Sequence, residues 1–148
     1  MDEYKFAYSV VDSLINRRQA TTTFYLSVNT GILAVIGLLI KDAQLIQVWL
    51  IISLIILLVA GMLACWIWFN LLKQYEALIN WWYSRLRELE VSFPNSSQLI
   101  TREYKDLYQK NSSSAKLGMT RRECLITYIF FALYLVFVVG LVFTLIFK

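Results

Sequence analysis

The chain has 148 residues, of which 59% are hydrophobic and 16% charged, with a formal net charge of +4 and no histidine. Without histidine the chain lacks the commonest general base and the commonest transition-metal ligand. We also find no nucleophile elbow, no glycine-rich phosphate loop and no metal-ligand spacing. We therefore expect no enzyme activity, no catalytic residue, no metal and no cofactor, and we interpret Cys65 and Cys124 as reduced packing residues.

Three stretches without any charged residue, 19–40, 43–72 and 124–147, are the main signal in the sequence. Each exceeds the roughly 20 helical residues that cross about 30 Å of hydrocarbon. None shows the regular alternation of a membrane β-barrel strand. The predicted fold class is an all-α integral membrane protein: three transmembrane helices with long cytosolic helical extensions, assembled as an oligomer.

Residues 1–20 are predicted to form a cytosolic amphipathic helix. Apolar side chains recur there at helical spacing: Tyr4, Ala7, Tyr8, Val11, Leu14 and Ile15. No glycine or proline separates this segment from the apolar residues that follow. We therefore expect one continuous helix that enters the membrane near Arg18.

A transmembrane hairpin is predicted over residues 21–70, with spans at about 21–40 and 44–70 joined by a turn at 41–43. Thr23, Ser27 and Thr30 share one face of the first span. Because polar groups facing lipid are costly, this face should meet another helix or water. With Asn29, these residues are candidates for lining a pore. The alternative is that they bond to neighbouring helices or to their own backbone.

A cytosolic helical module is predicted over residues 71–120, before a third transmembrane helix over 121–148. Its first helix carries an apolar stripe near the heptad period: Tyr75, Leu78, Trp82, Leu86 and Leu89. We predict that this stripe is the oligomer seam, because one N-terminal helix covers only part of it. Pro94 should end the helix. A short helix should follow with one apolar face, made of Ile100, Tyr104, Leu107 and Tyr108.

An aromatic and basic cluster in this module offers possible ligand contacts: Trp81, Arg85 and Arg87. Exposed aromatic rings beside basic residues can stack on nucleotide bases. They are also common as interfacial anchors or in helix packing. Glu88 and Glu90 point to different helix faces, so we interpret them as solvated charges rather than a carboxylate pair.

The distribution of lysine and arginine predicts the orientation. Nine of these residues lie between positions 73 and 122, and Arg17 and Arg18 precede the first span. Only Lys41 and Lys148 fall on the other side. The positive-inside rule places the N-terminus and the 73–123 segment in the cytoplasm and the C-terminus outward. Because positive residues flank membrane spans for this reason, nucleic acid is not expected as a partner.

Three short motifs resemble the RipA family of small octameric bacterial membrane proteins: Tyr75-x-x-Leu78, Leu89-Glu90-x-x-Phe93-Pro94 and Thr101-x-Glu103-Tyr104. They follow an N-terminal helix and a membrane hairpin. This plan is also similar to that of the two-span SLATT effectors of bacterial immunity. The resemblance implies a homo-octamer of the bacterial inner membrane with its cytosolic helices gathered into a ring. For the SLATT-like group it implies a pore that damages the membrane of an infected cell.

Two functions follow as hypotheses. The first is a pore or channel effector, active in anti-phage defence and gated by a cytosolic regulatory protein or a nucleotide signal. The second is a non-conducting membrane scaffold or accessory subunit. In both, the expected partners are the lipid bilayer and further copies of the chain.

Overall fold

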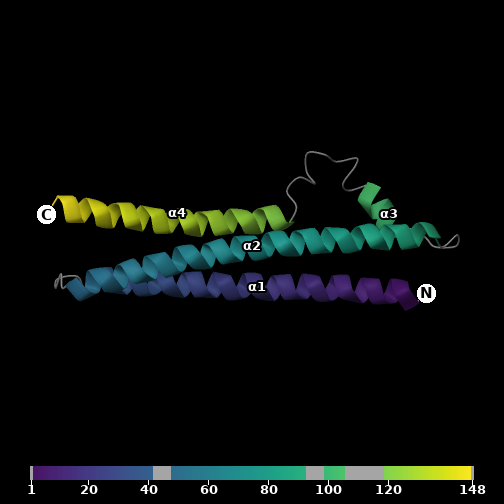
Figure 1. Ribbon diagram of the computed structural model, residues 1–148, viewed down its shortest axis with the longest axis horizontal. Helices are drawn as coiled ribbons and strands as arrows, with labels where there is room; N and C mark the ends of the chain where they lie inside the picture. The colour runs from purple at the N-terminus through teal and green to yellow at the C-terminus, as the bar shows by residue number, and fades with distance from the viewer. Residues whose placement is uncertain (1, 42–47, 93–98, 106–118, 148) are drawn as a thin grey trace. The chain divides into compact units, whose positions relative to one another are not determined.

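The computed structural model describes residues 2–41, 48–92, 99–105 and 119–147, and all of these residues except Phe147 are helical (Figure 1). The helices are α1 (Asp2–Lys41), α2 (Val48–Ser92), α3 (Leu99–Tyr104) and α4 (Met119–Ile146). Across these ranges there is no β-strand. The predicted all-α fold class is confirmed.

Three helices are long and apolar enough to cross a membrane, over Glu3–Lys41, Trp49–Ser92 and Arg122–Ile146. The predicted three transmembrane helices are thus confirmed by length and composition. At 40 and 45 residues, α1 and α2 are each far longer than the roughly 20 residues that a bilayer needs. Both therefore continue well beyond their apolar segments.

The end of α2 follows the sequence signal. The helix stops at Ser92, two residues before Pro94, because proline disfavours the helical conformation of the residue in front of it. Two other predictions lie outside the described residues. These are the path of the turn after Lys41 and the continuation of the short helix to Leu107 and Tyr108.

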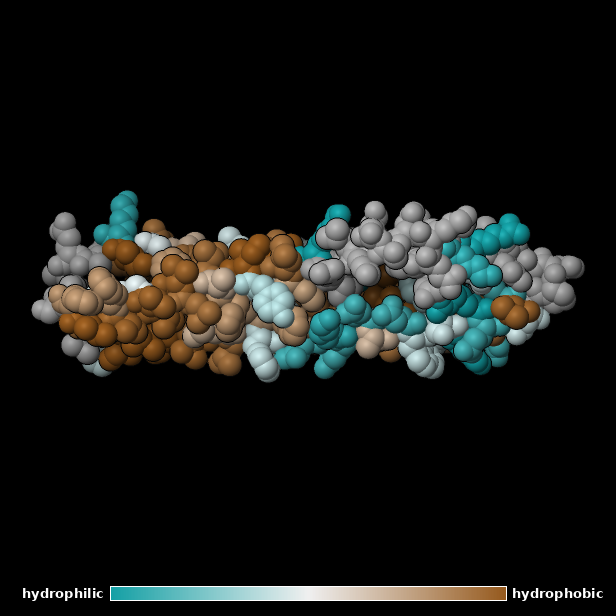
Figure 2. Space-filling model, turned by 90° about the horizontal axis from the view of Figure 1, so that it is seen from above, coloured by the Kyte–Doolittle hydropathy of each residue, from teal (hydrophilic) through white to brown (hydrophobic). Residues whose placement is uncertain are grey.

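The chain divides into two compact units. The first, here called the extension unit, comprises Met1–Ala20 and Leu71–Arg122. The second, here called the membrane unit, comprises Thr21–Asn70 and Glu123–Lys148. Where its described residues are visible in Figure 2, the membrane unit has a mostly apolar surface and the extension unit a mostly polar one.

The core of the membrane unit joins α1, α2 and α4. Its buried residues come from all three helices: Ile36, Leu58, Cys65 and Tyr134. Partly buried apolar residues surround them, among them Leu54, Met62 and Phe130. Most other apolar side chains of these helices face outward, as expected for surfaces that meet lipid or another copy.

The core of the extension unit is the contact between the first half of α1 and the second half of α2. Ala7 and Val11 of α1 pack with Leu86 of α2, and all three are buried. The predicted amphipathic stripe is buried at Ala7, Val11 and Leu14 and partly buried at Tyr4 and Ile15, but Tyr8 is 59% exposed. Successive helical residues are rotated by about 100°, so Tyr8 turns away from the face that buries Ala7.

Candidate functional site

Three hydroxyl-bearing residues of α1 lie together on the surface of the membrane unit. Thr23, Ser27 and Thr30 are all exposed. The Ser27 hydroxyl donates to the backbone oxygen of Thr23 over 3.0 Å, and the Thr30 hydroxyl donates to that of Leu26 over 2.8 Å. The hydroxyl protons of Ser27 and Thr30 are therefore hydrogen-bonded inside the helix. Their oxygens still have lone pairs that can accept hydrogen bonds from water.

The same face of α1 continues toward the end of the helix with small residues. Ala34 and Gly37 follow Thr30 at steps of four and three residues, and both are exposed. A methyl group added at Gly37 would meet no atom within 4 Å. From Thr23 to Gly37 this row of five small, uncharged residues extends over roughly 21 Å of helix, with the exposed Leu26 and Leu38 beside it. We call it the hydroxyl face.

Asn29 does not belong to the hydroxyl face, although we grouped it with the other pore-lining candidates. Its side chain is fully buried in the membrane unit. The side-chain oxygen accepts hydrogen bonds from the Tyr134 hydroxyl at 3.0 Å and from the Cys65 thiol at 3.2 Å. The amide nitrogen donates to the backbone oxygen of Tyr25 at 2.8 Å. Asn29 therefore joins α1 to α2 and α4 within one chain.

The ring of Tyr134 lies directly on Gly61 of α2. A methyl group at Gly61 would overlap this ring and come within 2.7 Å of the tyrosine hydroxyl oxygen. On the same side of the core, Trp68 is fully buried and stacks on Tyr25, with ring centroids 6.0 Å apart. In the sequence, Tyr134 is one of two tyrosines in the mostly apolar α4, and neither is marked out as the one that is buried.

The predicted oligomer seam is only partly open in the single chain. Leu86 is fully buried in the core of the extension unit, where α1 covers it. Tyr75, Trp82 and Leu89 are half-buried, and Leu78 is 44% exposed. Leu86 therefore belongs to the core of its own chain, whereas Leu78 and part of Trp82 remain accessible to another copy. The seam itself stays a prediction.

The predicted ligand contacts lie on an exposed part of α2. Trp81 is 59% exposed and lines an open surface depression together with Ser84, Arg85 and Glu88. The Arg85 guanidinium makes a 2.8 Å ion pair with Glu88 one turn further on. Arg87 is partly buried. The structure thus brings Trp81 and Arg85 to one depression, where the carboxylate of Glu88 offsets the positive charge of Arg85.

Glu90 is not the solvated charge that we expected, because it is 97% buried by the α1 and α3 segments around it, with only 3% of its surface exposed. Its carboxylate accepts hydrogen bonds from the backbone N–H groups of Ile100 and Thr101, at 3.0 and 2.9 Å. It also accepts the Thr101 hydroxyl at 2.7 Å and the Tyr4 hydroxyl at 3.3 Å. Glu90 therefore holds the start of α3 and the start of α1 against α2.

These hydrogen bonds control the protonation of the pair. Desolvation by burial raises the pKa of Glu90, but the hydrogen bonds from Thr101, Ile100 and Tyr4 together outweigh it, and the pKa lies below its ordinary value. Burial, followed by the charge of Glu90, raises the pKa of Tyr4. Glu90 is therefore ionised and Tyr4 protonated at neutral pH, as their hydrogen bond requires.

Within the described ranges, no three histidine, cysteine, aspartate or glutamate side chains lie close enough together to hold a metal ion. No curated protein and no solved structure matches the chain. The family described as the octameric membrane protein family (8xMP) matches residues 1–144. This match confirms the predicted likeness to a family of small octameric membrane proteins and the predicted homo-oligomer. The chain therefore belongs to the octameric membrane protein family.

Proposed function

We propose that the protein forms a homo-oligomeric pore in the bilayer, with the hydroxyl face of α1 toward the central axis. The observation that carries this proposal is the exposure of Thr23, Ser27 and Thr30 on one side of the membrane unit. Lipid is a poor environment for a row of hydroxyl groups. Water at the axis of the assembly is a better one.

The eight subunits that the family description gives favour an assembly with open space along its central axis. Helices pack about 8–10 Å apart, so a ring of eight α1 helices places their axes about 10–13 Å from the centre. Subtracting a helix radius of about 5 Å leaves a clear radius of roughly 5–8 Å. Eight helices cannot close such a ring with their own side chains when those are threonine, serine, alanine and glycine. The space requires water or lipid, and the hydroxyl face favours water.

The sequence supports the rest of the proposal. We place the pore in the bacterial inner membrane, with the N-terminus and the extension unit in the cytoplasm and the C-terminus outside, because of the lysine and arginine asymmetry. The likeness to SLATT-type effectors supports a role in anti-phage defence without enzyme activity. In this proposal a cytosolic protein or a nucleotide gates the pore.

Substituted-cysteine labelling tests the proposal. The native cysteines, Cys65 and Cys124, are both buried and give a low background. A membrane-impermeant thiol reagent should modify Thr30→Cys in the assembled protein. It should not modify Val35→Cys, which is also exposed in the single chain but lies on another side of α1, where we expect lipid. If Thr30→Cys and Val35→Cys reacted equally, or if Thr30→Cys did not react, a water-filled axis lined by the hydroxyl face would be refuted.

One observation favours the alternative, a non-conducting scaffold. Ser27 and Thr30 already donate to their own backbone, so they need no water to satisfy their protons. Small residues such as Ala34 and Gly37 also let helices approach closely. If the hydroxyl face packs against a neighbouring copy, Thr30→Cys stays unmodified while the protein remains assembled.

A further inference from the structure

We propose that an apolar surface of the extension unit binds the extension unit of a neighbouring copy. This surface, here called the aromatic row, consists of Phe6, Leu78, Trp81 and Trp82. The inference rests on the family membership and on the contacts below. It holds whether or not the assembly conducts.

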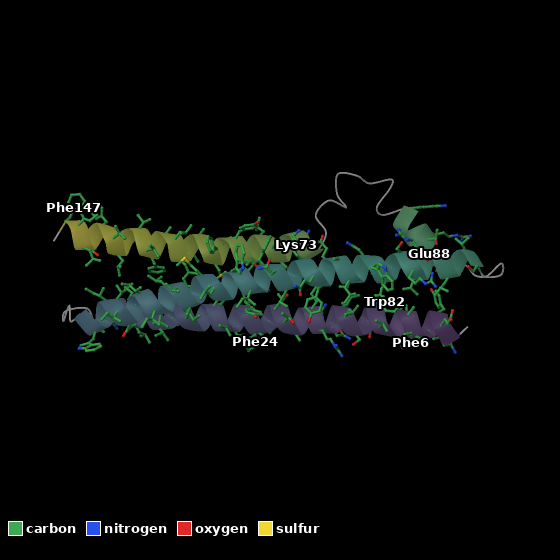
Figure 3. The ribbon with its side chains drawn as sticks, in the orientation of Figure 1. Phe6, Phe24, Lys73, Trp82, Glu88 and Phe147 are labelled. Atoms are coloured by element: carbon green, nitrogen blue, oxygen red, sulfur yellow. The ribbon has the colours of Figure 1, made fainter. Side chains whose placement is uncertain are left out.

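Three aromatic rings form a continuous row across two helices. Phe6 of α1 meets Trp82 of α2 edge to face, with centroids 6.4 Å apart and an interplanar angle of 72°. The Trp82 ring in turn meets the Trp81 ring at 4.9 Å and 85°. Figure 3 labels Phe6 on α1 and Trp82 on α2, which run alongside each other in this part of the extension unit. Such edge-to-face pairs hold each ring in place before any partner arrives.

The row is exposed, although the unit that carries it is polar over most of its visible surface. Phe6 is 65% exposed, Trp81 59% and Leu78 44%. Leu78 lies one turn before Trp82 on the same helix, so it extends the row along α2. Contiguous exposed apolar surface marks an interaction site. Tryptophan rings in such a surface are frequent anchors of protein interfaces.

The charges beside the row favour a protein copy over a lipid surface. Arg85 and Glu88 form a 2.8 Å ion pair next to Trp81. Anionic headgroups require unbalanced clusters of basic residues, whereas this pair is locally neutral. In addition, Trp81 follows the last α2 residue of the membrane unit by eleven positions, outside the apolar window.

Membership of an octameric family identifies another copy of the chain as the partner that binds the aromatic row. An octamer tethers eight extension units near one another, so even a weak contact between them is favoured by a high local concentration. In a closed ring the contact joins two different surfaces of neighbouring copies. The aromatic row of one copy therefore meets another face of the next, and each copy supplies one row.

Photocrosslinking in the full-length protein in native membranes tests this contact. p-Benzoyl-phenylalanine in place of Trp81 should yield covalent adducts of two and more chains after irradiation. The matched control is the same group in place of Val91, which is 68% exposed but lies ten residues along α2 from Trp81. It should yield few such adducts.

A second substitution tests whether the row itself makes the contact. Leu78→Glu should reduce the chain-to-chain adduct from position 81 at least about tenfold, because a buried charge at the interface is costly. Val91→Glu should leave it unchanged. An adduct to lipid, to another protein or within one chain would overturn the proposal, as would an adduct that survives Leu78→Glu.

Discussion

The hydroxyl of Tyr134 in α4 donates a 3.0 Å hydrogen bond to the side-chain oxygen of Asn29 in α1, and both side chains are fully buried. The same oxygen accepts the Cys65 thiol of α2. A single polar atom thus connects the three helices of the membrane unit. In surroundings without water, separating these helices leaves polar groups unsatisfied. The bond therefore helps to specify where α4 packs.

Removing the Tyr134 hydroxyl should weaken the membrane unit. Tyr134→Phe keeps the ring and deletes the donor, so we expect a loss of about 0.6 kcal/mol, the average for such bonds in membranes, and at most about 1.7 kcal/mol. Reversible unfolding in mixed micelles measures it. Tyr128→Phe, in the same helix but 60% exposed, is the control and should change little. Equal effects of the two substitutions would show that the bond contributes nothing.

Gly61 should be intolerant of even a methyl group. Gly61→Ala places a carbon inside the space of the Tyr134 ring, and overpacking of this kind costs about 1–3 kcal/mol. Gly140→Ala in α4 meets nothing within 4 Å and should stay within about 0.5 kcal/mol of the unmodified protein. The same unfolding measurement distinguishes them. If Gly61→Ala left the free energy of unfolding unchanged, α4 would have to shift on α2 without cost.

Glu90 should make the extension unit sensitive to acid. Its pKa in the folded protein lies below the ordinary value of 4.5, so between these two values the unfolded chain binds more protons than the folded one. The stabilisation by Glu90 is complete above about pH 4.5 and is lost as the pH falls through the lowered pKa. Hydrogen exchange of α3 amides as a function of pH measures it.

The matching substitution is Glu90→Gln. It leaves the N–H groups of Ile100 and Thr101 with a weaker acceptor and should cost about 1–3 kcal/mol at neutral pH. It should also remove the acid dependence. Glu88→Gln, at an exposed ion pair, should preserve that dependence. If the acid dependence persists in Glu90→Gln, another group is responsible for it.

The orientation can be tested with reporter fusions. Fusions at residue 1, residue 112 and residue 148 should report inside, inside and outside, because nearly all lysine and arginine residues flank one side of the spans. An inside signal at residue 148 would contradict the single membrane crossing predicted for the third apolar segment.

Much of the fold could be predicted because its signals are local. The uncharged segments indicated three membrane helices, and the spacing of Ala7 and Val11 indicated the buried side of α1. Proline at position 94 indicated the end of α2. Each signal depends on residues within a few turns of one another, so no knowledge of the three-dimensional contacts was required.

The partners of buried polar residues could not be predicted in this way. Asn29 and Tyr134 are 105 positions apart, and nothing near either residue indicates the other. Glu90 looks solvated on α2 alone, because α3 supplies three of its hydrogen-bond donors only after the chain has turned back. Leu86 looked available for another copy because the sequence could not show how completely α1 covers it.

Ion flux through liposomes that contain the purified assembly tests the pore most directly. Together, Thr23→Val, Ser27→Val and Thr30→Val remove the three hydroxyls, keeping the side-chain volume at the two threonines and enlarging it at the serine, so the axis should lose water and the flux should fall at least about tenfold. Ser53→Val in α2 is the control, since Ser53 is also exposed and bonded to its own backbone. It should leave the flux unchanged, and native mass measurement should find all three proteins equally assembled. A triple variant that assembles and conducts like the unmodified protein would contradict the account.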